Sequence, residues 1–184
     1  MATQEDNQIT PKTSSNVRGG VGVVRSVDTY AAQCEKCLKW RVITTQEEYE
    51  EIRSKIIENP FVCDRKSGVS CEDLADLELN ASRTWVIDKP GIPKTPEGFK
   101  RSLVLRRDFS KMDAYYITPT GKKLRTRNEI AGFLDANPKY KGVSIDDFNF
   151  TSPKVMDETI PEDVKKANAA AAASSNKKVK VLKD

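Results

Sequence analysis

The sequence predicts an α+β protein made of two small units with disordered termini, and three observations indicate this. All four cysteines fall between residues 34 and 71 of the 184-residue chain. Residues 96–134 contain three short strand-like runs followed by one apolar helical face. Hydrophobic residues make up 38% of the chain and charged residues 32%, a balance that suits small folded units with polar flanks. We expect a four-cysteine unit over residues 21–88 and, over 82–152, a three- to four-stranded antiparallel sheet packed on one helix.

The four-cysteine unit is expected to hold two short strands and one helix. Residues 21–27 and 40–43 are rich in β-branched or aromatic side chains, as strands are. Thr45 and Glu48 have the spacing of a capping box, which marks the start of a helix. The Asn-Pro pair at 59–60 marks its end. The apolar positions at helical spacing between these signals are Tyr49, Ile52 and Ile56.

The second unit follows a proline-rich segment, residues 90–96, which we expect to be a semi-rigid linker. Thr126 and Glu129 form another capping box, and Pro138 lies beyond the end of the helix that it starts. The expected strands are 102–106, 114–117 and 122–125, and the apolar face of the helix holds Ile130, Phe133 and Leu134.

Both ends of the chain are expected to be disordered. Residues 1–20 are polar without periodicity, and residues 153–184 form an Ala/Lys-rich tail without a hydrophobic pattern. The chain starts without an apolar signal region and has no apolar run near the ~20 residues that cross a bilayer. We therefore expect neither secretion nor a membrane partner.

The chain has a net charge of +4, and its acidic and basic residues are concentrated in different segments. Residues 46–89 carry 11 acidic and 6 basic side chains, whereas residues 94–127 carry 10 basic and 3 acidic ones. Six lysines and no acid follow between Lys165 and Lys183. A concentrated basic block favours a polyanionic partner, and the alternative is an ordinary solvated surface.

The cysteines have the number and spacing of a metal site. Cys34-x-x-Cys37 places two thiolates on one tight turn, and Cys63 and Cys71 follow at wider spacing. Four thiolates leave no open coordination position, so the expected site holds one structural Zn²⁺ and activates no water. Disulfides are disfavoured in a chain that is not secreted. The alternative is a set of buried free thiols with a redox pair at Cys34 and Cys37.

The segment from Gln33 to Arg41 resembles the heart of a CW-type zinc finger, whose motif is Cys-x-x-Cys-x-Lys-Trp-Arg. The resemblance covers about residues 24–88 and implies that the two later cysteines complete the zinc shell. It also implies that Trp40 forms one wall of an aromatic cage for a methylated lysine of a histone tail, since a ring face attracts a quaternary ammonium. The alternative for Trp40 is core packing beside the metal.

The expected cage departs from the family pattern at one wall. Ala31 stands where the family usually has a tryptophan before the first cysteine. Tyr30 or Trp85 would have to supply that wall instead.

The second unit resembles a methyl-CpG-binding domain over about residues 82–152. Combined with the zinc unit, it resembles the plant methyl-CpG-binding domain proteins that carry a CW finger. The segments that carry the resemblance are Phe99–Arg101, Arg106–Arg107, Asp113–Thr126 and Phe148–Phe150.

This resemblance implies roles for four residues at a CpG step. Arg106 and Arg125 would each contact a guanine, because a guanidinium forms paired hydrogen bonds with O6 and N7. Asp113 would orient an arginine or meet the groove edge, and Tyr115 would approach a cytosine methyl group through water. The alternatives are phosphate contact for the two arginines and strand packing for Tyr115.

Other basic residues of this unit are expected to contact phosphates, which position a protein without specifying sequence. The loop over residues 107–113 is shorter than in well-known methylation readers and lacks their glycines. We therefore expect DNA binding, while a preference for methylated CpG stays open. The expected phosphate contacts are Lys100, Arg101, Arg107, Lys111, Lys122, Lys123 and Arg127.

These features predict a nuclear, chromatin-associated protein that binds double-stranded DNA containing CpG and regulates transcription. Its zinc unit is expected to contact a histone tail or another protein. The alternative is an adaptor that recruits a chromatin-modifying complex through the zinc unit and binds DNA weakly. An enzyme is disfavoured, because histidine is absent and every cysteine is assigned to metal. Residues 177–180, Lys-Lys-Val-Lys, suit a nuclear import signal or non-specific DNA contact.

Overall fold

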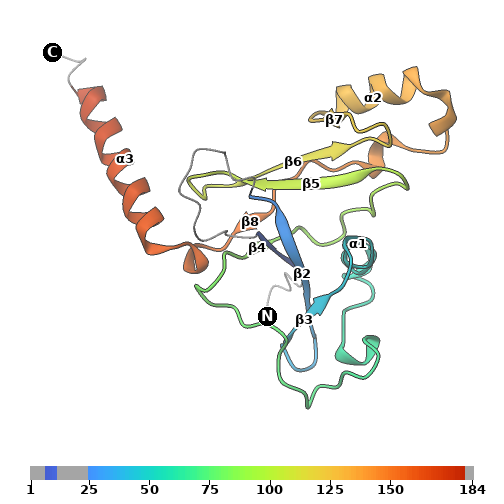
Figure 1. Ribbon diagram of the computed structural model, residues 1–184, viewed down its shortest axis with the longest axis horizontal. Coiled ribbons are helices and arrows are strands. Elements are labelled where there is room, and N and C mark those ends of the chain that lie inside the picture. Colours follow the sequence, from blue (N-terminus) through green and yellow to red (C-terminus); the bar gives the residue numbers. More distant parts are fainter. Residues whose placement is uncertain (1–6, 12–24, 181–184) are drawn as a thin grey trace.

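The computed structural model describes residues 7–11 and 25–180 of the chain, and within them it has an α+β architecture with two antiparallel sheets (Figure 1). None of the helices in this part of the chain combines the length and the apolar character needed to span a membrane.

The larger sheet has five strands and carries the four-cysteine unit. Its order is β3-β2-β1-β4-β8, and every neighbouring pair is antiparallel. Its strands are β1 (Asn7–Pro11), β2 (Val27–Gln33), β3 (Trp40–Ile43), β4 (Val86–Ile87) and β8 (Lys154–Val155).

Two local predictions for this unit meet different outcomes. The strand at 40–43 is confirmed as β3. The strand predicted over 21–27 lies mostly outside the described residues, and β2 instead begins at Val27 and continues to Gln33. Two alanines of β2 are fully buried and pair with β3, so tertiary contact rather than β-propensity holds that strand.

Helix α1 (Gln46–Lys55) packs against β2 and β3, as Figure 1 shows. The Thr45 side chain accepts a hydrogen bond of 3.1 Å from the backbone N–H of Glu48, which confirms the predicted start. Tyr49, Ile52 and Ile56 are buried, so the apolar spacing seen in the sequence is the face that packs inward.

The smaller sheet has three strands, β5 (Lys100–Leu105), β6 (Met112–Ile117) and β7 (Lys123–Leu124), in that order. Helix α2 (Arg127–Ala136) covers one end of its inner face, and both halves of the Thr126–Glu129 capping box are formed. The predicted sheet packed on one helix is confirmed. The core between sheet and helix holds Phe99, Tyr116, Leu124, Ile130, Phe133 and Phe148.

The two units share one hydrophobic core. Backbone hydrogen bonding also joins them, because the Leu105 N–H donates to the carbonyl of Arg25 at 2.9 Å, next to a bridge between Ser26 and Val104. The shared core combines Ala32, Ile43, Tyr49, Ile52, Ile56 and Phe61 of the first unit with Leu103, Leu105, Phe109 and Met112 of the second.

The proline-rich segment at 90–96 lies along α1 instead of spacing the units apart. The Gly91 N–H donates to the carbonyl of Arg53 at 3.0 Å, and the Thr95 N–H donates to Glu50 Oε2 at 2.8 Å. Lys94 forms an ion pair with Glu47 at 3.1 Å. The segment is therefore part of the interface between the two units.

A buried ionic cluster also joins the units. Asp88, which follows β4, is 1% exposed and pairs with Arg53 of α1 at 2.9 Å and with Arg101 of β5 at 2.7 Å. Arg101 also donates to the carbonyl of Thr151 at 3.0 Å. The prediction that Arg101 contacts phosphate is wrong, because its guanidinium is buried against Asp88.

The chain remains packed beyond residue 152. Val155 of β8 and Ile160 are buried in the shared core, and the backbone N–H of Trp85 donates to Thr159 Oγ1 at 2.9 Å. Helix α3 (Glu162–Lys180) follows. The predicted disordered tail from 153 is wrong for these described residues, because a few apolar positions without periodicity suffice to attach a short strand.

Candidate metal centre and nucleic-acid interface

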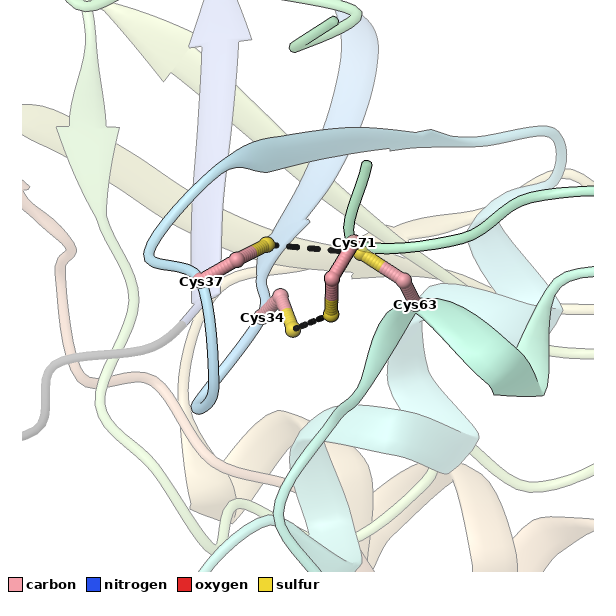
Figure 2. Close-up of side chains that lie close together, drawn as sticks. All are labelled: Cys34, Cys37, Cys63 and Cys71. Carbon is pink, nitrogen blue, oxygen red and sulfur yellow. Dashed lines mark hydrogen bonds between the residues drawn. The ribbon is translucent and has the colours of Figure 1, made fainter. Parts of the chain in front are cut away.

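The four cysteines converge on one point (Figure 2). Cys34 and Cys37 lie on the turn between β2 and β3, Cys63 begins a 3₁₀ turn after α1, and Cys71 lies on the following loop. The four Sγ atoms all lie within 4.8 Å of one another. The prediction that these four residues form one cluster is confirmed.

The sulfur separations fit a tetrahedral zinc ion. Cys34 Sγ lies 3.8 Å from Cys71 Sγ, and Cys37 Sγ lies 3.6 Å from Cys63 Sγ. Sulfurs bound at a Zn–S distance of about 2.3 Å in a tetrahedron are separated by about 3.8 Å. All four cysteines are free of disulfides. The four sulfurs therefore form a closed site for one structural Zn²⁺.

The electrostatics of the cluster also call for a cation. Burial opposes ionisation of Cys34, but hydrogen bonds from the backbone of Cys37, Cys63 and Lys36 outweigh it and lower its pKa to about 6. Burial and the neighbouring sulfurs raise the pKa of Cys71 to about 12. One cysteine of the cluster therefore ionises readily, but four thiolates this close together repel one another. A bound divalent ion offsets that repulsion and allows all four to be deprotonated.

Arg41 stabilises the metal centre, although no role beyond its place in the motif was predicted for it. Its side chain is fully buried, and Nε donates to Cys63 Sγ at 3.2 Å. Nη2 donates to the carbonyls of Ser70 and Asp73, and Nη1 donates to Asp76 Oδ1 at 3.1 Å. The guanidinium thus fixes the loop that carries the fourth cysteine. A charged residue inside an otherwise apolar strand was the available signal.

The three residues expected around a methyl-lysine do not come together. Trp40 and Trp85 pack against each other in a tilted arrangement, with ring centroids 5.4 Å apart and ring planes at 58°, and they are 8% and 0% exposed. Tyr30 pairs with Ile43 while Trp40 pairs with Gln33, so Tyr30 points to the other face of the sheet and packs on Tyr49. The expected cage is not formed, and Trp40 takes the alternative role of core packing.

Strand register places the candidate DNA contacts on one face of the smaller sheet. Val104 pairs with Asp113, Ser102 with Tyr115, and Lys123 with Ile117, so these side chains share a face. The opposite face is the buried one that holds Met112, Tyr116 and Leu124. By the same alternation Arg106 and Arg125, which follow β5 and β7, fall on the outward face and are exposed.

Two contacts on this outward face arrange its charged groups. Arg106 donates to Asp113 through Nε at 3.1 Å and Nη2 at 2.9 Å, a paired arrangement that fixes the guanidinium. The Arg106 guanidinium holds the pKa of Asp113 below its ordinary value, so the carboxylate stays ionised at neutral pH. Lys123 Nζ lies 3.9 Å from the centre of the Tyr115 ring. Arg125 follows strand β7, and its backbone N–H donates to Glu129 of the capping box.

The hairpin between β5 and β6 is short and attached at three points. Phe109 adopts a φ of +59° and turns its ring into the shared core, where it is 3% exposed. Arg25 Nη1 donates to the carbonyl of Arg107 at 2.9 Å, and Asn168 Nδ2 of α3 donates to the carbonyl of Asp108 at 2.6 Å. The hairpin keeps its shape without a glycine because the Phe109 ring anchors it in the core and the side chains of Arg25 and Asn168 bind its carbonyls.

The remaining expected phosphate contacts lie at the surface around this face. Arg127 pairs with Asp146 at 2.7 Å, so that guanidinium has a protein partner already. The exposed residues of the set are Lys100, Arg107, Lys111, Lys122, Lys123 and Arg127.

Comparison with known families agrees with both units. The family model described as methyl-CpG binding domain matches residues 85–158, and the one described as CW-type zinc finger matches residues 30–77. The methyl-CpG-binding domain-containing protein 4 of Arabidopsis thaliana is 60% identical over 162 residues, which are 88% of this chain and 87% of that protein. This chain belongs to the methyl-CpG-binding domain protein family.

Other members of the family extend the comparison. The methyl-CpG-binding domain-containing protein 1 of Arabidopsis thaliana is 67% identical over 140 residues, covering 76% of this chain and 69% of that protein. The methyl-CpG-binding domain protein 2 of Mus musculus is 33% identical over 67 residues, covering 35% of this chain and 15% of that protein. No solved structure gives a significant match. The family's DNA-binding domain and zinc finger are thus both present here in one packed body.

Proposed function

We propose that this protein binds double-stranded DNA containing a CpG step in the nucleus, through the outward face of the β5-β6-β7 sheet, as a chromatin-associated regulator of transcription. The observation that carries the proposal is that Arg106 and Arg125 share this face, with Arg106 held by Asp113. Arginines fixed by a carboxylate are suited to the O6 and N7 acceptors of guanine in the major groove.

In this proposal cytosine methylation makes a secondary contribution to affinity. Tyr115, the residue expected near a methyl group, has Lys123 over its ring, and the β5–β6 hairpin is short and fixed. A fixed short hairpin forms few new phosphate contacts on binding, so most of the affinity comes from the surrounding basic residues.

The test is a fluorescence anisotropy titration with three duplexes: CpG, symmetrically methylated CpG, and a duplex in which GpC replaces CpG. Both CpG duplexes should bind more tightly than the GpC duplex, and every affinity should fall steeply with salt. Arg125→Ala should cost on the order of 1–3 kcal/mol on CpG and remove the discrimination against GpC. Equal affinity of wild type and Arg125→Ala for all three duplexes would contradict the proposal.

A second candidate function is an adaptor that recruits a chromatin-modifying complex through the zinc unit and binds DNA weakly. Two exposed leucines on the loops around the metal centre favour it: Leu38 is 66% exposed and Leu74 is 89% exposed. With the tryptophan pair buried, such apolar loop residues would supply the protein contact. Affinity purification with the Leu38→Ser/Leu74→Ser variant as control decides this, because an adaptor loses its partner in that variant while its DNA affinity is unchanged.

A further inference from the structure

The residues that precede β2 pair with β5, the edge strand of the smaller sheet, close to the point where β5 ends and Arg106 follows (Figure 1). Ser26 forms an antiparallel bridge with Val104, and the Leu105 N–H donates to the carbonyl of Arg25 at 2.9 Å. This short pairing extends the candidate DNA-binding sheet by two residues of the first unit. Arg25 therefore lies beside the residue that precedes Arg106.

The side chain of Arg25 reaches the residue on the other side of Arg106. Its Nη1 donates to the backbone carbonyl of Arg107 at 2.9 Å. Its guanidinium carbon lies 4.7 Å from the centre of the Phe109 ring, which is 3% exposed, and a ring face attracts such a cation. Arg25 thus holds the chain on both sides of Arg106, through its own carbonyl before it and through its guanidinium after it.

Arg106 has two further restraints within the second unit. Its backbone N–H donates to the carbonyl of Lys111 at 3.0 Å, and its guanidinium is paired with Asp113. These contacts fix the guanidinium relative to the hairpin, whereas Arg25 fixes the hairpin relative to the first unit. Paired hydrogen bonds to O6 and N7 of guanine require both, because the guanidinium has to be held in one place.

We propose that Arg25 is a positioning residue for DNA recognition, which holds the β5–β6 hairpin so that Arg106 meets a guanine of the CpG step. The inference rests on the proposed function, since it needs a duplex on the outward face of the sheet. Arg25 acts through Arg106 and does not itself contact the DNA. Both contacts of its guanidinium, with the Arg107 carbonyl and the Phe109 ring, lie within the protein.

The test variant is Arg25→Met, which removes the charge and every side-chain donor but keeps a long side chain. The matched control is Arg83→Met. Arg83 Nη1 donates to Thr29 Oγ1 of β2 at 3.3 Å, so this change removes the same charge from the same unit without touching the hairpin. Both arginines are half-buried, and both variants should therefore stay folded, which circular dichroism of the zinc-saturated proteins checks.

The first measurement is amide hydrogen exchange of the protein without DNA. The Phe109 N–H donates to the carbonyl of Arg106 at 3.0 Å, so its exchange reports opening of the hairpin, as does that of the Arg106 N–H. Both amides should exchange roughly 2–10-fold faster in Arg25→Met, as expected for the loss of one hydrogen bond, and at the wild-type rate in Arg83→Met. Wild-type rates in Arg25→Met would overturn the proposal.

The second measurement is a double-mutant cycle with Arg106→Ala, on CpG and GpC duplexes. Arg25→Met alone should reduce the preference for CpG by roughly 2–10-fold. In the Arg106→Ala background, where Arg125 still reads the other guanine, Arg25→Met should cause no further loss. The slope of log K against log salt should change by much less than the roughly 0.9 of a lost phosphate contact. An additive loss, or a slope change of that size, would show that Arg25 contacts DNA directly and would refute the positioning role.

The failures of the two proposals are distinguishable. If Arg25→Met keeps the wild-type preference for CpG while Arg125→Ala loses it, only the role of Arg25 is refuted. If wild type itself shows no preference for CpG over GpC, the proposed function is refuted, and the exchange rates alone then decide whether Arg25 fixes the hairpin.

Discussion

Replacing Asp88 with asparagine should destabilise the whole folded body, because this carboxylate is the anion between two buried guanidinium groups. Asp88 and its partners Arg53 and Arg101 are all less than 5% exposed. Asparagine keeps the shape of the side chain but removes its charge. Removing one partner of a buried ion pair costs about 3–5 kcal/mol, since the remaining charge is left uncompensated. For a chain of this size the melting temperature should fall by roughly 6–20 °C.

The pH dependence of this effect follows from the pKa of Asp88. Burial opposes ionisation of the carboxyl, but the Arg101 and Arg53 guanidinium groups outweigh it and hold its pKa below the ordinary value. The group binds protons more weakly in the folded than in the unfolded protein, where its pKa is about 3.9. Its contribution to stability is therefore fully present above about pH 5 and is lost as the pH falls through the folded-state pKa.

The assay is urea unfolding of zinc-saturated protein, followed by circular dichroism at pH 7 and at pH values below 5. The difference in unfolding free energy between wild type and Asp88→Asn should be largest at pH 7 and shrink with acid. Glu47→Gln, which removes one partner of an exposed ion pair, is the control and should change the midpoint little. A difference below about 1 kcal/mol at pH 7 would show that the cluster does not join the two units as described.

Three further predictions follow from the site. Arg41→Met should weaken zinc binding by about 10–100-fold, because it removes the hydrogen-bond donor to Cys63 and frees the loop that carries Cys71. A competition titration with a chelator measures this, and unchanged zinc affinity would refute the role of Arg41. Removing zinc with a chelator should lower both the DNA affinity and the melting temperature, since the two units share one core. Unchanged DNA binding by the zinc-free protein would refute the coupling between the metal centre and the DNA-binding face. Asp113→Asn should reduce discrimination between CpG and GpC duplexes by loosening Arg106, and anisotropy titrations that show unchanged discrimination would contradict it.

The features of the fold and site that were predicted correctly are those that short, local residue patterns determine. Both capping-box patterns marked helix starts, because in each the threonine side chain accepts a short-range hydrogen bond from the backbone N–H three residues later. The number and spacing of the four cysteines predicted that their side chains lie together, since few sites other than a metal centre use four thiolates at such spacing. The outward face of the smaller sheet followed from the resemblance together with strand alternation.

What depends on long-range packing was not predictable from those patterns. Arg101 looked like its basic neighbours, and only the partner Asp88, thirteen residues earlier, makes it a buried residue. Tyr30 and Trp40 looked like members of one cage, but the pairing of β2 with β3 puts them on opposite faces. The segments around residues 90–96 and 154–160 lack periodicity, so their attachment to α1 and to β4 gave no sequence signal.

The central claim is that DNA lies on the outward face of the β5-β6-β7 sheet of a single body that includes the zinc unit. Mapping backbone amide chemical shifts during titration with a CpG duplex tests it most directly. The largest changes should occur at Arg106, Asp113, Tyr115, Lys123 and Arg125, while amides around the four cysteines and along α1 change little. Changes centred on the metal centre or α1, with none on that sheet face, would contradict the account.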